Sequence, residues 1–502
     1  MYDRRASGVL LHPTSLPGRG GIGDLGNAAY RFIDWLTHAK QRRWQVMPLG
    51  PTSYGDSPYA GLSALAGNPL LISLERLVQD QLLTQAELDA APDFPADHVD
   101  FGPVIEWKMS LLQRAYANFT THGTVQQRTA FEAFHMAHAE WLDDFALFAA
   151  LKEAHGGAPW NAWERDIACH QPDAVAAWRH KLSDRVRFQQ FTQWLFFSHW
   201  LDVKRYANQH DIRIIGDIPI FVAYDSADVW ANPDLFYLDE AGNPTVVAGV
   251  PPDYFSATGQ RWGNPLYRWD VLAQRGYDWW IRRFRETLRL VDIVRLDHFR
   301  GFEAYWEVPA AEVTAINGRW VKGPGSALFE AMRTALGDVP IIAEDLGLIT
   351  LEVDMLRDDQ AFPGMAVLQF AWGDAATNSY QPHNYQRNLV VYTGTHDNDT
   401  TRGWWQSLDE RARTHIQHYL HISGDEIAWD LIRVALMSVA DTAITPLQDV
   451  LNLGNEARMN TPGQLGGNWA WRFVPEQVTP EIAERLGALT SLYGRVPLPI
   501  ER

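Results

Sequence analysis

Short apolar runs alternate along the chain with amphipathic stretches of helical period. The clearest runs cover residues 212–217, 292–297, 341–345 and 389–397, and each ends in an acidic residue. Most of them follow a stretch in which apolar residues recur every three or four positions, as they do on one face of a helix. Alternating strands and helices, with acids at the carboxyl ends of the strands, are typical of a (β/α)8 barrel enzyme.

Eight runs are predicted to be strands of this barrel, although the sixth and the eighth are also compatible with buried helix segments. In a parallel barrel the carboxyl ends of all strands open at one mouth, so acids on different strands converge there. The predicted strands cover residues 7–13, 43–51, 212–217, 292–297, 339–345, 366–372, 389–398 and 443–449.

The connection between the second and third predicted strands is too long for a simple loop. Residues 74–210 show long stretches of 3.6-residue period. We therefore predict an α/β fold, a TIM barrel with large, mainly helical insertions. Residues 1–73 begin the barrel, residues 74–210 form an inserted helical subdomain, and residues 211–502 complete the barrel. Residues 218–270, approximately, are predicted to be an inserted substrate-binding loop region. About 50 residues follow the last strand, too few for a C-terminal β-domain.

Composition narrows the range of partners. The 502 residues include 43 Lys and Arg against 61 Asp and Glu, and the formal net charge of −18 disfavours nucleic acid and anionic membranes. No stretch approaches the roughly 20 apolar residues of a membrane span, and the first apolar run is too short for a signal peptide. Cys169 is the only cysteine, so we expect a reducing, cytoplasmic setting. The 22 Trp fit either a large core or a carbohydrate site.

Arg295 and Asp297 form the first candidate constellation. They are two residues apart, so in an extended strand both side chains point to the same face. The arginine would then hold the aspartate ionised and oriented, which suits a nucleophile. A structural buried ion pair would leave the same pattern.

Two further strand ends carry acids. Glu344 ends an apolar strand, where partial desolvation raises the pKa of a carboxyl group and favours proton donation. Asp345 follows at once, and the pattern does not say which of the two is a helix cap or solvated. His396 and Asp397 lie in a polar turn that also fits a local Asx turn. His and Asp side chains suggest a metal as well, although no separated His pair completes a common ligand set.

Three carboxylates on three strands fit retaining glycosyl transfer, in which one attacks the anomeric carbon and another acts as acid and then base. Asp217, on the third strand, is a further acid of the mouth. The loop of residues 249–267 combines glycines and prolines with side chains that suit either sugar binding or a hydrophobic plug. They are Asp253, Tyr254, Phe255, Gln260, Trp262 and Asn264. The turn-rich loop with Tyr54, Ser57 and Tyr59 has the same character.

Motifs along nearly the whole chain resemble those of the 4-alpha-glucanotransferases, the amylomaltase or disproportionating-enzyme family, which belongs to the α-amylase-like barrels. Their combination is much more specific than any single motif. The motifs are LLHPTSLPG, YGDSPY, GDIPIFV, GVPPDYFSATGQRWGNPLY, VRLDHFRGF, AEDLG, YTGTHDNDT and NEARMNTPG.

This resemblance implies roles for individual residues. It makes Asp297 the nucleophile, Glu344 the acid/base and Asp397 the residue that stabilises the distorted sugar. The sequence departs from the usual motif at Ala60 and Leu62, where larger groups are typical, and this puts the donor-side contacts there in doubt. The sugar-binding roles fall on Tyr59, Asp217, Arg295, His298 and His396, with Ser57 and Asn468 as further contacts and Tyr54 as a secondary glucan site.

The activity that the resemblance implies is retaining transfer of an α-1,4-glucan segment to the 4-hydroxyl of an acceptor glucose or glucan. It includes disproportionation of maltooligosaccharides and formation of cyclic glucans, and it needs no metal or cofactor. The alternatives are an α-glucan hydrolase with the same acids, a glucan-binding protein with an inactive site, and a metal-dependent barrel hydrolase. The sequence does not fix donor length, product balance, pathway or oligomeric state, and a monomer is compatible with it.

Overall fold

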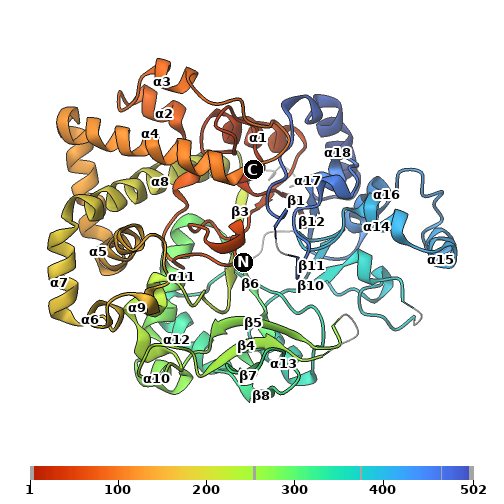
Figure 1. The fold of residues 1–502 in the computed structure, drawn as a ribbon. Helices are drawn as coiled ribbons and strands as arrows, with labels where there is room; N and C mark the ends of the chain where they lie inside the picture. The colour runs from red at the N-terminus through yellow and green to blue at the C-terminus, as the bar shows by residue number, and fades with distance from the viewer. Residues whose placement is uncertain (1–4, 253–255, 374–375, 465, 497–502) are drawn as a thin grey trace.

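The computed structural model describes residues 5–496 except 253–255, 374–375 and 465. Its centre is a barrel of eight parallel strands (Figure 1), hydrogen-bonded in the order β10-β11-β12-β1-β2-β3-β6-β9. The two end strands also meet, because the N–H of Ala343 donates to the carbonyl of Pro363 at 2.9 Å. The predicted TIM barrel is thereby confirmed. The strands are β1 (Ala6–Leu10), β2 (Arg43–Gln45), β3 (Arg213–Pro219), β6 (Ile293–Asp297), β9 (Ile341–Ala343), β10 (Gly364–Val367), β11 (Leu389–Tyr392) and β12 (Thr442–Pro446).

The sixth and eighth predicted strands are shorter than the sequence suggested. β10 is followed at once by a 3-10 helix, η7 (Leu368–Phe370), and β12 by the short helix α17 (Leu447–Val450). Leu368 and Leu447, each at the start of its helix, are fully buried. At these two places the short apolar run correctly predicted burial but did not distinguish a strand from a helix.

A layer of apolar side chains fills the barrel interior. Because side chains alternate along a strand, the residue two positions beyond an interior one also points inward, nearer the mouth. Asp217 thus lies above Ile215, and Arg295 and Asp297 lie above Ile293. The layer consists of Leu10, Ile215, Ile293, Ile342, Met365, Val367, Val390, Tyr392 and Ile444.

Helices cover the outside of the barrel and bury one face each. In α1, for example, Ala29, Phe32, Ile33 and Leu36 are buried, the spacing expected of an amphipathic helix. Besides the short α17, the α-helices outside the long helical segment are α1 (Asn27–His38), α9 (Ala227–Ala231), α10 (Trp269–Gln274), α11 (Asp278–Leu290), α12 (Ser326–Leu336), α13 (Leu351–Asp359), α14 (Thr401–Ser407), α15 (Glu410–Leu420), α16 (Ile427–Met437) and α18 (Pro480–Leu492).

The segment between β2 and β3 is helical, as its period predicted, and lies on the opposite side of the barrel from α14, α15, α16 and α18 (Figure 1). Aromatic rings form its core: Phe191 packs against Phe119 at 4.9 Å between ring centroids and against Trp194 at 5.8 Å. The indole N–H of Trp200 donates to the carbonyl of Leu290 at 2.7 Å and ties α8 to α11. The division at residues 73 and 210 stays a prediction. The helices are α2 (Leu74–Gln79), α3 (Gln85–Asp89), α4 (Phe101–His122), α5 (Val125–Ala154), α6 (Arg165–Ala168), α7 (Pro172–Lys181) and α8 (Ser183–Gln209).

A second, antiparallel sheet of four strands lies beside the barrel, in the order β5-β4-β7-β8. Sequence reasoning treated the region around residues 218–270 as loops, but two of its stretches are strands of this sheet. β4 pairs with β5 inside this region, and its other partner β7 comes from beyond β6. That second pairing is long-range and leaves no local sequence signal. The strands are β4 (Val246–Val250), β5 (Gln260–Pro265), β7 (Ala304–Pro309) and β8 (Arg319–Lys322).

None of the helices in the described part of the chain combines the length and the apolar character that crossing a membrane requires.

Candidate active site

A buried arginine joins two acids at the ends of neighbouring strands. Asp217 and Arg295 are register partners on β3 and β6. Nη1 of Arg295 lies 2.6 Å from Oδ2 of Asp217 and 3.0 Å from Oδ1 of Asp297. The contact that the spacing of Arg295 and Asp297 predicted is therefore present. The side chain of Asp297 keeps 30% of its surface exposed, so this end of the cluster opens to the mouth.

The protein around Asp297 affects its protonation in two opposing ways. Desolvation, with the negative charges of Asp217 and Asp397, raises the pKa of Asp297 to about 6, while the Arg295 guanidinium lowers it. Sequence reasoning expected the arginine to keep Asp297 ionised. Burial outweighs the arginine, so the carboxylate is ionised only above about pH 6.

Glu344 follows β9, the neighbour of β6 in the barrel. Its own N–H donates to the carbonyl of Leu296 at 3.0 Å, which places it beside Asp297. Oε2 accepts the N–H of His298 at 2.6 Å, and Oε1 accepts the N–H of Leu346 at 2.9 Å. These bonds favour the carboxylate, but burial and the charge of Asp297 raise the pKa of Glu344 to about 8. Glu344 thus holds a proton at neutral pH.

Asp345 points elsewhere. Its Oδ1 accepts the N–H of Met365 at 2.7 Å, and its Oδ2 pairs with Arg357. These contacts link the end of β9 to the start of β10, where the barrel closes. Of the two adjacent acids, Asp345 is structural and Glu344 is available to the site.

Asp397 lies in the turn after β11 and has two side-chain partners. Nε2 of His396 is 3.4 Å from its Oδ2, and Nδ2 of Asn460 donates to its Oδ1 at 2.6 Å. The local turn is formed by Asn398, whose Oδ1 accepts the N–H of Thr395 at 2.9 Å. This bond runs back to a residue three positions earlier, so it is not the Asx turn that the sequence suggested, in which a side chain bonds to the backbone two residues further on. The carboxylate of Asp397 faces the mouth, where 46% of its side-chain surface is exposed.

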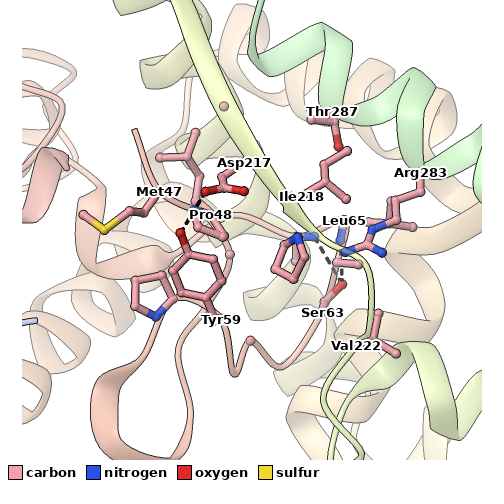
Figure 2. A pocket seen from close by; sticks show the side chains of 18 of the residues that line it. Met47, Pro48, Tyr59, Ser63, Leu65, Asp217, Ile218, Val222, Arg283 and Thr287 are labelled. Atoms are coloured by element: carbon pink, nitrogen blue, oxygen red, sulfur yellow. Dashed lines mark hydrogen bonds between the residues drawn. The ribbon is translucent and has the colours of Figure 1, made fainter. Parts of the chain in front are cut away.

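Tyr59 forms one wall of the mouth. Its hydroxyl donates to Oδ2 of Asp217 at 2.8 Å, and burial raises the pKa of this hydroxyl well above its usual value, so it stays protonated. Its ring stacks on His396 with centroids 5.1 Å apart, and Trp469 packs against both rings. Figure 2 shows the Tyr59–Asp217 bond at one end of a cavity of about 80 Å³, with Thr287 at the other end.

Three buried polar atoms of the mouth have no hydrogen-bond partner among the described residues: Oδ1 of Asp217, Nε2 of His298 and Nδ1 of His12. Such atoms are costly unless a ligand or water bonds to them. His298 has a left-handed backbone with φ 55°, and its ring meets the edge of Trp262 at 4.8 Å. Burial lowers the pKa of His298 to about 3, so the ring is neutral and can both donate and accept.

The remaining predicted contacts have local partners or lie outside the described residues. Oε1 of Gln260 accepts the indole N–H of Trp262 at 3.1 Å, and Oγ of Ser57 accepts the N–H of Tyr59 at 3.2 Å. Nδ2 of Asn264 donates to the carbonyl of Val222, outside the acid cluster. The amide of Asn468 bonds to Thr461 and Gln464 of its own loop. Asp253, Tyr254 and Phe255 lie outside the described residues, as does the side chain of Tyr54.

Sequence reasoning missed several residues of the mouth. Asn460 and Arg458, which donates to the backbone carbonyl of Asp397 at 2.7 Å, belong to the motif NEARMNTPG, but nothing in its pattern links it to the seventh strand. His12 lies two residues beyond interior Leu10 and lines a small cavity with His396. The inward alternation of β1 could have identified it. Within the described residues, no group of three or more His, Cys, Asp or Glu side chains could hold a metal ion.

A TIM barrel whose mouth gathers acids from the ends of β3, β6, β9 and β11 is typical of barrel enzymes that act on glycosidic bonds. The comparison with family models is more specific. The model of the 4-alpha-glucanotransferase family matches residues 11–477, and the chain belongs to this family. Its substrates are α-1,4-glucans and maltooligosaccharides, and its activity is the transfer of glucan segments.

Individual relatives agree over nearly the full length. The chain is 52% identical to the 4-alpha-glucanotransferase of Synechocystis sp. over 499 residues, which covers 99% of each chain. It is 51% identical to that of Thermus thermophilus, with 98% of this chain and 99% of the relative covered. Among solved structures, amylomaltase from Streptococcus agalactiae in complex with acarbose superimposes with a TM-score of 0.95 at 38% identity, covering 98% of this chain and all of the other.

Proposed function

We propose that Asp297 is the nucleophile of the transfer, that Glu344 is its acid and base, and that Asp397 stabilises the sugar as it distorts. One observation supports these roles above the others. Asp297 and Glu344 follow paired positions of neighbouring strands. Of these two acids, only Asp297 forms an ion pair with Arg295, and the pKa of Glu344 is raised above that of Asp297. Two carboxyl groups with separated pKa values are what a nucleophile and a general acid require.

In the first step, a carboxylate oxygen of Asp297 attacks the anomeric carbon of the donor. The bond from that carbon to the glycosidic oxygen breaks, and Glu344 gives its proton to the leaving oxygen. The product is a glycosyl ester on Asp297. In the second step, Glu344 as carboxylate takes the proton from the acceptor 4-hydroxyl, whose oxygen attacks the same carbon and releases Asp297. Two inversions give net retention.

The substrate contacts follow from the polar groups of the mouth. Asp217 and His298 each have one unpartnered polar atom, which sugar hydroxyls would satisfy. Tyr59 and His396 offer stacked rings beside them, and Trp262 covers the His298 side. Asp253, Tyr254, Phe255, Ser57, Gln260 and Tyr54 stay predicted contacts. Asn468 acts by shaping its loop, because its amide is already bonded there.

Two broader properties are part of the proposal. Because Cys169 is the only cysteine of the sequence, no disulfide can form within it, and a cytoplasmic site of action fits this composition. The roles assigned to Asp297, Glu344 and Asp397 all lie within one chain, which a monomer can supply.

The test compares two isosteric variants on maltotriose, with products resolved over time. Asp297→Asn removes the attacking group and should reduce kcat by at least about 10⁴-fold. Asp217→Asn, which alters the same cluster without removing the nucleophile, should cost less. Unfolding midpoints control for stability. Full disproportionation by the Asp297 variant, or a larger loss for the Asp217 variant, would show that the nucleophile has been misassigned.

A further inference from the structure

Trp320 is an exposed indole at the outer edge of the small antiparallel sheet. It lies on β8, and 41% of its surface is exposed. It faces Trp306 across the β7–β8 pair, with ring centroids 5.1 Å apart in an edge arrangement. The indole N–H of Trp306 donates to the carbonyl of Ala315 at 2.9 Å, which fixes Trp306 as a support. Within the described residues, the indole N–H of Trp320 makes no hydrogen bond.

Arg300 links this indole to both catalytic strand ends. Its guanidinium carbon lies 3.9 Å from the centre of the Trp320 ring, and Nη1 donates to the carbonyl of Leu348. Arg300 is three residues after Asp297, and Leu348 is four residues after Glu344. The ring of Trp320 therefore rests on a side chain that bridges the two loops leading from the proposed nucleophile and the proposed acid/base.

Two exposed leucines lie at this bridge or just after it in the sequence. Leu348 is 63% exposed, and Leu351, at the start of α13, is 71% exposed. Contiguous exposed apolar groups on a protein commonly mark a binding surface. Trp262 lies on β5 and Trp320 on β8, at opposite edges of the sheet, so about 14 Å of sheet, three strand spacings, separates their strands. A ligand that begins at Trp262 must be long to reach Trp320.

We propose that Trp320, supported by Arg300, is a stacking platform for the distal part of a long α-glucan whose reactive end lies in the mouth. The C–H face of a pyranose ring would pack on the indole, as sugars do on exposed aromatic rings. The side of the mouth from which this glucan extends is inferred from the proposed function. Glu344 protonates the leaving oxygen and later deprotonates the acceptor hydroxyl. The leaving glucan and the acceptor glucan therefore both extend from the Glu344 side of the mouth, where Leu348 and Arg300 lie. The platform would favour long chains over short ones.

The experiment measures KM and kcat for amylose and for maltotriose with Trp320→Ala. The ratio of the amylose KM to the maltotriose KM should rise about five-fold, the loss expected of one stacking contact, with little change in kcat. Trp320→Phe keeps a ring and should recover most of the effect. Trp178→Ala is the matched control, because Lys181 lies 3.7 Å over that ring but on α7 of the helical segment. Its KM ratio should not change.

An unchanged KM ratio for Trp320→Ala would overturn the proposal, whether neither KM changes or both rise by the same factor. An equal rise of both KM values would indicate local unfolding. A loss that disappears in high salt would point to a charged partner, because stacking on an uncharged glucan is insensitive to salt. Retardation of each variant in an amylose-containing gel measures binding without turnover. It separates a failure of the platform from a failure of the Asp297 and Glu344 roles, which the Asp297→Asn assay detects by itself.

Discussion

Two groups of charged and titratable side chains in this molecule, each centred on a buried residue, differ in setting. At the mouth, Arg295 lies between Asp217 and Asp297. Between α5 and α11, Glu286 lies 3.2 Å from His138 and 3.4 Å from Arg289.

The second group is packed among rings. The ring of His138 lies 4.5 Å from that of Phe134 and 5.4 Å from that of Phe197, and it packs edge to face with Trp141 at 5.8 Å between ring centroids. This second group connects α5, in the long helical segment, to α11, a helix of the barrel. The first group stands at strand ends, and one of its carboxylates is open to the mouth. Buried charge alone is therefore a weak indicator of catalysis, and a position at the open end of a barrel is the feature that favours a catalytic role for the first group.

Among changes that leave the acids of the mouth in place, the largest effect should come from removing their shared cation. Arg295→Met leaves Asp217 and Asp297 without a counter-charge, so the pKa of Asp297 rises further and the reactive carboxylate becomes scarcer. We expect kcat/KM for maltotriose to fall at least about 100-fold, as when a preorganised charge partner is lost. Arg289→Met is the matched control and should stay within about two-fold of wild type. Similar losses for both variants would remove the distinction between the two groups.

The pH dependence should sharpen the same distinction. The first step needs Asp297 ionised and Glu344 protonated, and burial raises their pKa values to about 6 and about 8. Activity should therefore be highest between these values. It should fall about tenfold per pH unit below about 6, as Asp297 gains its proton, and above about 8, as Glu344 loses its own. The two groups titrate as a pair, so the profile reports both together.

Glu344→Gln tests the alkaline limb with a glycosyl fluoride donor, whose fluoride leaves without an acid. Formation of the glycosyl-enzyme should then lose the fall at high pH and keep the fall at low pH. An alkaline limb that persists in this variant would assign it to another residue.

A smaller effect, on stability alone, is expected from the structural group. Glu286→Gln leaves His138 and Arg289 without their acid, and we expect the free energy of unfolding to fall by about 2 kcal/mol. The loss is limited because Arg289 is 43% exposed and can turn to solvent. The denaturation midpoint measures it, while kcat/KM for maltotriose should not change. A drop in activity without a change in the midpoint would mean that this group acts on the site.

The periodic part of the fold and its strand-end acids could be predicted from sequence. Alternation along a strand places Arg295 beside Asp297, and barrel topology alone brings Asp217 to the same mouth. The strand pattern could not choose between Glu344 and Asp345, and only the family resemblance did, because the difference depends on where β10 lies and on the N–H of Met365 that Asp345 accepts. The small sheet as a unit could not be predicted either, because its two local pairs, β4–β5 and β7–β8, are joined through β4 and β7, which are far apart in sequence.

Tryptophan shows the limit of composition. The number of tryptophans fitted a large core and a carbohydrate site equally well. The structure separates the two uses residue by residue: Trp44, Trp200 and Trp280 are fully buried, whereas Trp262 and Trp320 are 39% and 41% exposed beside the mouth and on the small sheet. Only the packing of each side chain carries this information.

The most direct test of the central claim is to trap the covalent intermediate. Glu344→Gln would be treated with an α-maltosyl fluoride that lacks the terminal 4-hydroxyl, so that it serves as donor but not as acceptor. Fluoride leaves without an acid, and without Glu344 no base activates water or a sugar, so the ester should accumulate. Peptide mass spectrometry should then find one maltosyl group on Asp297, and none after Asp297→Asn in the same background. A maltosyl group on Asp217 or Asp397, or none at all, would contradict the account.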